Sequence, residues 1–158
     1  MPANTTPIFS LTPNIGTVLI GTTSAQVKSD GTSAGTGTDL MYSAFASGTN
    51  GSFVQRVRFN CVASAAAVNS VATTLRVYLT TVNTAVGSAA GATTNANTFL
   101  LAEISVPIIS ASNSTNATNY YEVPLNIAIP TGRWIYVSQH IAQTSNQAWN
   151  VKVIGGDY

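Results

Sequence analysis

Apolar and polar residues alternate most clearly over residues 53–62. One side of the alternation carries mostly apolar side chains: Phe53, Val57, Phe59 and Cys61. The other side carries polar side chains: Arg56, Arg58 and Asn60. A period of two is typical of a β-strand with one buried face. At ~3.3 Å per residue such a strand spans roughly 33 Å, the height of a small domain.

Residues 74–82 repeat this pattern. Leu75, Val77 and Leu79 alternate with Arg76, Tyr78 and Thr80. The sequence therefore predicts two long strands that share a core.

Further strands are predicted at six places: 17–21, 39–46, 98–107, 120–129, 133–141 and 148–154. Loops are predicted between them, at 29–38, 63–72, 82–97 and 110–119. Asn50-Gly51 is a strong hairpin signal, so we expect residues 40–46 to pair with 53–62. About eight strands without a helix indicate an antiparallel β-sandwich of the jelly-roll type, with an immunoglobulin-like Greek key as the alternative.

Residues 1–16 are predicted to form an extended N-terminal arm, followed by the sandwich domain at 17–158. Prolines recur at positions 2, 7 and 13, and each removes a backbone donor. The apolar residues Ile8, Phe9 and Leu11 lie between them. Two interpretations remain open: the arm lies along its own sandwich, or it lies on a neighbouring subunit.

The composition argues against several classes of protein. Charged residues make up 7% of the 158 residues and the net charge is +1, whereas a nucleic-acid-binding protein needs clustered Lys and Arg. The first residues show no secretory signal, and no apolar run approaches the ~20 residues of a membrane span. A neutral surface of Thr, Ser and Asn does little to keep copies apart, which suits a protein that assembles.

The sequence offers little for catalysis. Its five carboxylates and single histidine show no spacing typical of a catalytic or zinc site. We therefore expect no enzymatic activity, no cofactor and no metal. Cys61 is predicted to be a buried hydrophobic residue. His140 is predicted to be a polar strand residue, with a metal or anion held by three copies on a trimer axis as the alternative.

Ile8, Phe9 and Leu11 of the arm are candidate interface residues, and two further sets are candidates for binding. The first is Arg56, Arg58, Arg76 and Tyr78, which form either a solvated outer face or a contact patch. The second is Trp134, Tyr136 and Trp149, which either pack in a core or interface or stack on a sugar.

The chain resembles the small jelly-roll structural proteins of tailed bacteriophage virions, above all capsid decoration (cement) proteins. The resemblance lies in the proline-bearing arm, the Thr/Ser/Asn-rich sandwich and the segment 125–137, where Ile129-Pro-Thr-Gly132 joins two predicted strands. It implies homotrimers on the outer capsid surface that bind the major capsid protein and bridge capsomers. The alternative is a receptor- or carbohydrate-binding module of a phage tail or baseplate.

Overall fold

The computed structural model describes residues 12–21, 41–65, 68–90, 97–111 and 120–158. Over these ranges the chain is all-β and contains no helix. Eight strands have six or more residues: β1 (Thr12–Ile20), β2 (Met41–Ala46), β3 (Ser52–Ala63), β5 (Thr73–Thr80), β7 (Thr98–Val106), β9 (Tyr120–Ile129), β10 (Trp134–Gln139) and β11 (Gln147–Asp157). Three strands have two residues each: β4 (Val68–Asn69), β6 (Ala89–Ala90) and β8 (Ser110–Ala111). The predicted all-β class and the number of long strands are confirmed.

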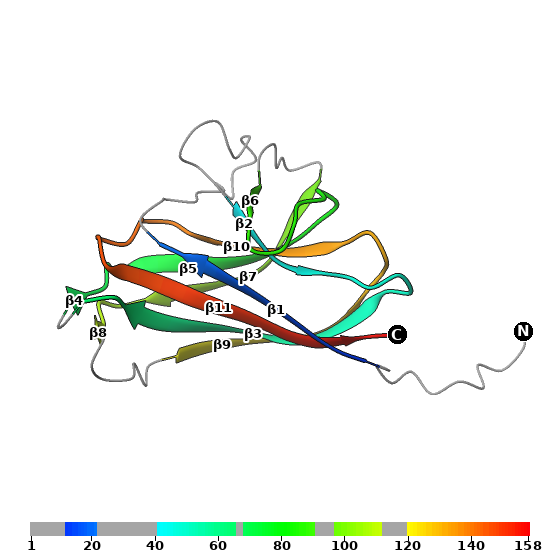
Figure 1. Ribbon diagram of the computed structural model, residues 1–158, viewed down its shortest axis with the longest axis horizontal. Coiled ribbons are helices and arrows are strands. Elements are labelled where there is room, and N and C mark those ends of the chain that lie inside the picture. Colours follow the sequence, from blue (N-terminus) through cyan, green and yellow to red (C-terminus); the bar gives the residue numbers. More distant parts are fainter. Residues whose placement is uncertain (1–11, 22–40, 66–67, 91–96, 112–119) are drawn as a thin grey trace, which may run out of the picture.

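The long strands form two antiparallel sheets that lie against each other like a sandwich (Figure 1). Sheet 1 has the order β1-β11-β3-β9, and sheet 2 has the order β6-β2-β10-β5-β7. The long strands pair from the two ends of the chain inward: β1 with β11, β2 with β10, β3 with β9, and β5 with β7. Thr12 consequently lies opposite Asp157, and the first described residues meet the last ones.

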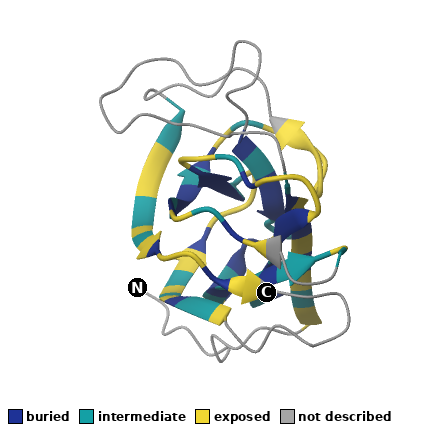
Figure 2. Cartoon of the chain, turned by 90° about the vertical axis from the view of Figure 1, so that its left-hand side faces the viewer, coloured by how far each residue is buried: buried dark blue, intermediate teal, exposed yellow. Residues whose placement is uncertain are grey.

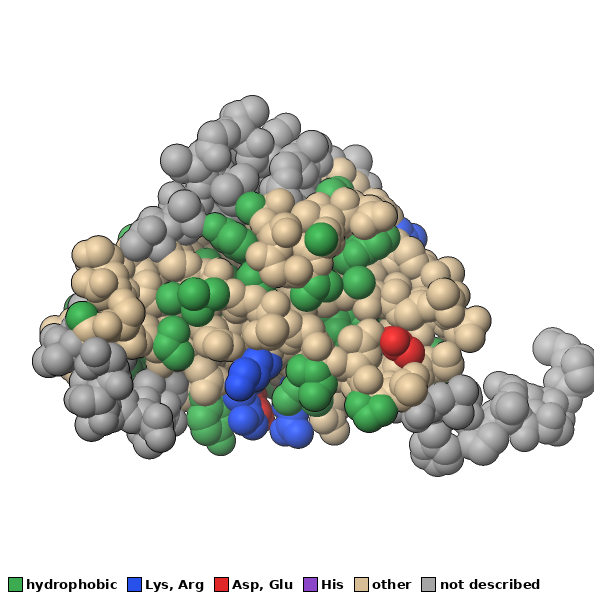
Figure 3. Space-filling model, viewed as in Figure 1, with side chains coloured by type: hydrophobic (Ala, Val, Ile, Leu, Met, Phe, Trp, Pro, Cys, Tyr) green, Lys and Arg blue, Asp and Glu red, His purple; other side chains and the backbone are tan. Residues whose placement is uncertain are grey.

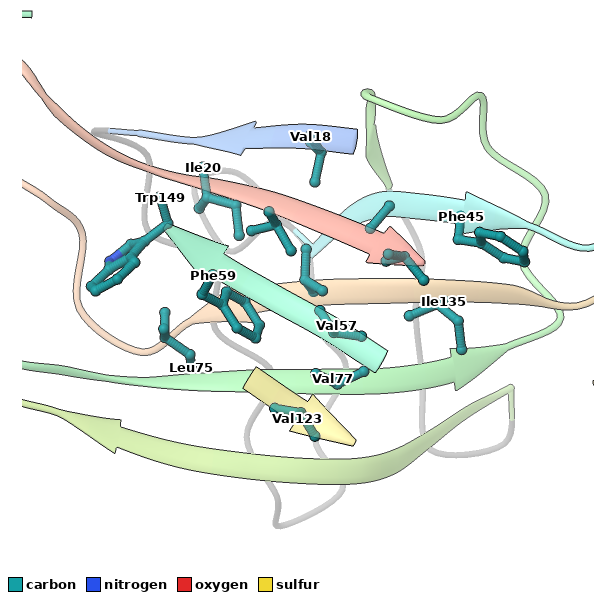
Figure 4. Packing of buried hydrophobic residues seen from close by; sticks show 14 of the residues in the cluster. Val18, Ile20, Phe45, Val57, Phe59, Leu75, Val77, Val123, Ile135 and Trp149 are labelled. Carbon is teal, nitrogen blue, oxygen red and sulfur yellow. The ribbon is translucent and has the colours of Figure 1, made fainter. Parts of the chain in front are cut away.

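The core lies between the two sheets and is built from the apolar side of each alternating strand. Figure 4 shows side chains from both sheets pointing into it, and Figure 2 shows the buried stretches gathered in the interior. Sheet 1 contributes Val18, Ile20, Val57, Phe59, Val123 and Trp149, and sheet 2 contributes Phe45, Leu75, Val77 and Ile135. Burying one such side chain stabilises the fold by about 1.5–3 kcal/mol, so this cluster is a main source of stability.

The alternation of β3 changes phase near its start. Val54 is fully buried, whereas Phe53 is only half-buried. Gln55 has no partner on β11, because Val54 pairs with Gly155 and Arg56 pairs with Ile154. An extra residue of this kind is a β-bulge. The expectation that Phe53 shares the buried face of Phe59 is therefore wrong, and Val54 takes that place.

A second bulge alters β7. Its register against β5 shifts between Val77 and Tyr78, which pair with Ala102 and Leu100. Leu100 is 37% exposed while Val106 is buried, so these two residues do not share one buried face, although a regular alternation along the strand would place them on the same side. Pro107 directly follows this strand, which lies at the edge of sheet 2, where a residue without a backbone donor is tolerated.

The turn at residues 47–51 joins the two sheets and does not form a hairpin. β2 belongs to sheet 2 and β3 to sheet 1, so the predicted pairing of residues 40–46 with 53–62 is wrong. Gly51 has a φ of 90°, so the turn itself lies where Asn50-Gly51 predicted it. The turn Pro130–Gly132 crosses between the sheets in the same way, and Ser47 N donates to Arg133 O over 3.0 Å.

Part of the expected N-terminal arm belongs to the sandwich. Residues 12–16 form the first half of β1 and pair with β11. Of the two interpretations, an arm that lies along its own sandwich therefore applies to residues 12–16, and the sandwich begins before position 17. Ile8, Phe9 and Leu11 lie outside the described residues, so the arm that would contain them stays a prediction.

The three short strands fall in segments that the sequence assigned to loops. β4 pairs with β8 in a small ribbon, and β6 pairs with β2 at the edge of sheet 2. A strand of two residues leaves no periodic pattern in the sequence. The predicted loop 29–38 lies outside the described residues.

The carboxylate of Asp157 holds the end of β11 against β1 and β3 through hydrogen bonds. It accepts hydrogen bonds from Asn14 Nδ2, at 2.9 Å, and from Ser52 Oγ. Tyr158 N donates to Gly51 O over 3.2 Å. These bonds connect β1, β3 and the crossover turn, so this carboxylate has a structural role.

Candidate protein-binding face

The outer face of sheet 1 is the side of β1, β11, β3 and β9 that points away from the core. Residues paired across neighbouring strands point to the same side of a sheet, so the registers define three rows on this face. The first row is Ile15, Ile154, Arg56 and Pro124; the second is Thr17, Lys152, Arg58 and Glu122; the third is Leu19, Asn150, Asn60 and Tyr120.

Basic side chains gather in the middle of this face. Arg56, Arg58 and Lys152 lie in two adjacent rows, and Glu122 is the one carboxylate among the three rows. Figure 3 shows basic side chains grouped on the visible surface, with an acidic side chain between them and apolar side chains on either side. The face therefore carries two positive charges in excess, a large share for a chain whose net charge is +1.

Glu122 orders the two arginines. Arg58 Nε donates to Glu122 Oε1 over 2.7 Å, and a second nitrogen of the same guanidinium also donates to it. Arg56 NH1 lies 3.6 Å from Glu122 Oε2. The hydrogen bonds from Arg58 lower the pKa of Glu122. Burial opposes this effect, and the charges of Arg58 and Arg56 add to the lowering. Ion pairs this exposed add little to stability, so their main effect is to hold the guanidinium groups in place.

Apolar side chains flank the charges. Ile15 is 63% exposed, Leu19 57% and Tyr120 53%. The Arg58 guanidinium lies over the Tyr120 ring, 4.5 Å from its centroid. Ordered Arg and Tyr side chains beside exposed aliphatic ones are typical of the centre of a protein–protein interface.

Three polar side-chain atoms on this face are buried without a partner among the described residues: Arg56 Nε and the side-chain oxygens of two asparagines. Asn60 Oδ1 and Asn150 Oδ1 accept no hydrogen bond from the residues that the structure describes. The two residues lie opposite each other on β3 and β11. A buried acceptor without a donor costs about 1–3 kcal/mol.

The structure separates the four residues that the sequence proposed as one patch. Arg56 and Arg58 lie on the outer face of sheet 1, whereas Arg76 and Tyr78 lie on β5 of sheet 2. Arg76 is 9% exposed and Tyr78 is 2% exposed. The idea of a solvated outer face is therefore wrong for these last two, and no patch contains all four.

Each of the two buried residues has a structural role. Arg76 Nε donates to Glu103 Oε2 over 2.6 Å, and Arg76 NH1 lies 3.4 Å from His140 Nδ1. Tyr78 packs with Met41 and Tyr136 in a small apolar cluster, and burial raises its pKa. His140 is exposed as expected, but it directly follows β10 and is not part of a strand as predicted.

The three proposed sugar-stacking rings are in large part covered. Trp149 and Tyr136 are 0% exposed, and Trp134 is half-buried against the same cluster as Tyr136. Trp149 meets Tyr121 edge-on in the core, with ring centroids 6.1 Å apart. Tyr136 OH donates to Val82 O over 2.7 Å. The core interpretation holds for Trp149 and Tyr136, because neither ring offers a face to a ligand.

Sequence reasoning missed most of this face, because its candidates did not include Ile15, Leu19, Tyr120, Glu122 or Lys152. The signal in β1 was present, since Ile15, Thr17 and Leu19 alternate with Gly16, Val18 and Ile20. Placing the boundary of the arm at position 16 divided this strand in two and hid its outward side.

The remaining candidates for chemistry are few in the described part of the chain. Cys61 is 1% exposed, and burial raises the pKa of its thiol. Over the same residues no three His, Cys, Asp or Glu side chains are close enough to hold a metal ion. No helix there is long and apolar enough to span a membrane.

Models of known protein families match no part of this chain, and a search of curated proteins finds no relative.

Proposed function

We propose that this chain is a non-enzymatic structural protein of a tailed-bacteriophage virion, a decoration (cement) protein that binds the outer capsid lattice. The observation that carries the proposal is the outer face of sheet 1, where exposed Ile15 and Leu19 lie beside ordered Arg56 and Arg58. The partner is the major capsid protein, through a surface with acidic side chains around an apolar centre.

We infer further that the sandwich is a jelly roll. A jelly roll has eight strands wound as two Greek keys in two sheets. In such a winding the first strand pairs with the last, the second with the last but one, and so on inward. The pairing of β1 with β11, β2 with β10, β3 with β9 and β5 with β7 supports this topology over an immunoglobulin-like arrangement.

Binding through this face stabilises a capsid by mass action. A protein that binds only the assembled lattice lowers the free energy of the assembled state. The effect grows with the ratio of the free protein concentration to its Kd. A homotrimer, which the resemblance implies, presents three copies of the face, so the second and third contacts form at a high effective concentration. Bridging neighbouring capsomers follows if those contacts fall on different capsomers.

If a major capsid gene lies beside this one, the test is binding to empty shells assembled from its product. The purified chain is mixed with shells and sedimented, and the bound fraction is measured against concentration. We expect saturable binding, and at least ~10-fold weaker binding for Leu19→Glu, which places a carboxylate against an acidic partner.

Ile141→Glu is the matched control. Ile141 is 47% exposed and follows β10 of the opposite sheet, so this variant should bind like the unmodified chain. Equal weakening by both variants would remove the outer face of sheet 1 from the proposal. No binding by the unmodified chain, together with a tail-fibre or baseplate gene beside it, would contradict the decoration function itself.

A further inference from the structure

A second surface feature lies at the ends of β5 and β7, on sheet 2. It is a shallow hollow of about 320 Å³, a size that accommodates one sugar residue. Its polar lining comes from Thr80, Thr81, Asn97, Thr98 and Arg133, and its apolar lining comes from Leu79 and Phe99. None of these residues belongs to the outer face of sheet 1.

Arg133 supplies an available positive charge. No carboxylate of the described residues forms an ion pair with its guanidinium. Its backbone is held at the crossover, because Arg133 N donates to Ser47 Oγ over 3.2 Å and Arg133 O accepts from Ser47 N. Guanidinium groups bind carboxylates through two parallel hydrogen bonds, so an anionic ligand suits this position.

Phe99 supplies an apolar surface beside that charge. The residue is 69% exposed, although phenylalanine is usually buried. It lies at the start of β7 opposite Leu79, so its backbone is fixed by the sheet. An exposed ring on a backbone that the sheet holds in place can pack against the apolar face of a sugar at little cost in conformational entropy.

The polar rim of the hollow is held by its own hydrogen bonds. Thr80 Oγ1 donates to Asn97 O over 2.7 Å, and Thr98 Oγ1 donates to Asn97 Oδ1 over 2.9 Å. Thr81 N donates to Asn97 O over 3.1 Å, and the Thr81 side chain is exposed. Hydroxyl groups both donate and accept, so this rim matches the hydroxyls of a sugar ring.

We propose that this hollow binds an acidic saccharide, such as a hexuronic acid residue. The sugar carboxylate pairs with Arg133, the apolar face of the ring lies on Phe99, and the sugar hydroxyls contact the rim formed with Thr81. The site is independent of the capsid-binding face, so a virion protein that carried both would hold the lattice on one side and a cell-surface glycan on another.

The test is a titration of the ¹⁵N-labelled chain with sodium glucuronate, followed by amide chemical shifts, with glucose as the neutral ligand. We expect saturable shifts centred on Asn97–Phe99 and Arg133, with a Kd of about 1–10 mM, as for other ligands of this size. Glucose should bind at least ~10-fold more weakly, because it lacks the carboxylate.

Variants assign the roles. Arg133→Gln and Phe99→Ser should each raise the Kd at least ~10-fold, whereas Arg133→Lys should retain part of the affinity because it keeps the charge. Ile108→Ser is the matched control for Phe99, since Ile108 is 63% exposed and follows the far end of β7. Its spectrum and affinity should stay unchanged.

Four results would overturn the proposal. Two concern the ligands: no saturation by about 50 mM glucuronate, or a Kd for glucose equal to that for glucuronate. The other two are an equal change of Kd in Ile108→Ser and Phe99→Ser, and amide shifts with inorganic phosphate equal to those with glucuronate. The last result would identify a general anion site. Each of them leaves the shell-binding experiment unaffected.

Discussion

Glu122 lies on β9 opposite Arg58, within reach of Arg56 as well. Removing it would leave three cations on the outer face of sheet 1 with no carboxylate among them. Glu122 thus limits the repulsion between the arginines, and the face still carries a net positive charge.

Replacing Glu122 by Gln should flatten the acid limb of the stability curve. Folding lowers the pKa of Glu122. The ion pair therefore stabilises the fold fully at pH values above the ordinary glutamate pKa of about 4.3. As the pH falls below that value, Glu122 becomes protonated and this stabilisation is lost. Urea unfolding midpoints between about pH 5 and pH 3 should therefore fall less steeply for Glu122→Gln.

Salt provides the control for this prediction. Exposed ion pairs are screened at high ionic strength, so added salt should reduce the difference between the two proteins. Identical pH dependence of the two midpoints would show that the pair does not affect folding.

The two tryptophans should report different surroundings. Trp149 is 0% exposed and Trp134 is half-buried. In Trp134→Phe the remaining emission should be blue-shifted and resist quenching by iodide, because iodide does not enter a packed core. Red-shifted, readily quenched emission would contradict the buried position of Trp149 and restore it as a stacking ring.

Strand β1 lies unusually close to β2 of the opposite sheet. A Cβ atom at Gly16 would lie 1.8 Å from Ala44 O, which no side chain can tolerate without movement of the backbone. Asn14 Nδ2 also donates to Ala46 O over 3.2 Å. The glycine therefore allows the two sheets to approach each other at this edge.

Gly16→Ala should destabilise the fold by about 2–4 kcal/mol, as expected for overpacking against backbone. Gly21→Ala is the matched control, because a Cβ there meets nothing within 4 Å, and it should change the free energy of unfolding by less than about 0.5 kcal/mol. Urea unfolding measures both. Equal stability of the two variants would mean that β1 does not approach β2 this closely.

Elements were predictable where their alternation was long and regular. β9 has the predicted bounds, and β11 contains the predicted 148–154 but continues to Asp157. The turns at Asn50-Gly51 and Pro130–Gly132 lie where the sequence placed them. The bulge at Gln55 was not predictable, because one extra residue reverses the buried side without changing the composition.

The partners of the strands were predictable only in part. Local signals at Asn50-Gly51 indicate a turn but do not say which sheet the next strand joins. That choice depends on contacts between distant residues, such as Ser47 with Arg133. For the same reason the sequence grouped Arg76 with Arg56, although the two lie on different sheets.

At the scale of the whole molecule, the first long strand pairs with the last one beside the core, and the surface carries few charges. Only 7% of its residues are charged, and half of its six Lys and Arg residues lie on the outer face of sheet 1: Arg56, Arg58 and Lys152. A weakly charged surface with one basic, partly apolar face favours association through that face.

The composition and the single histidine could be read from the sequence, and they directed attention to binding over catalysis. The face itself could not be read in full. It combines residues from both ends of the chain, such as Leu19 and Asn150, and their pairing depends on the order of strands in sheet 1.

The most direct test of the central claim is a cryo-electron microscopy reconstruction of the shells with the chain bound. We predict that sheet 1 faces the major capsid protein, with Ile15 and Leu19 buried at the contact and the Arg56–Arg58–Glu122 group beside acidic residues of the shell. Density in which the outer face of sheet 1 points into solvent, while another surface touches the shell, would contradict the account.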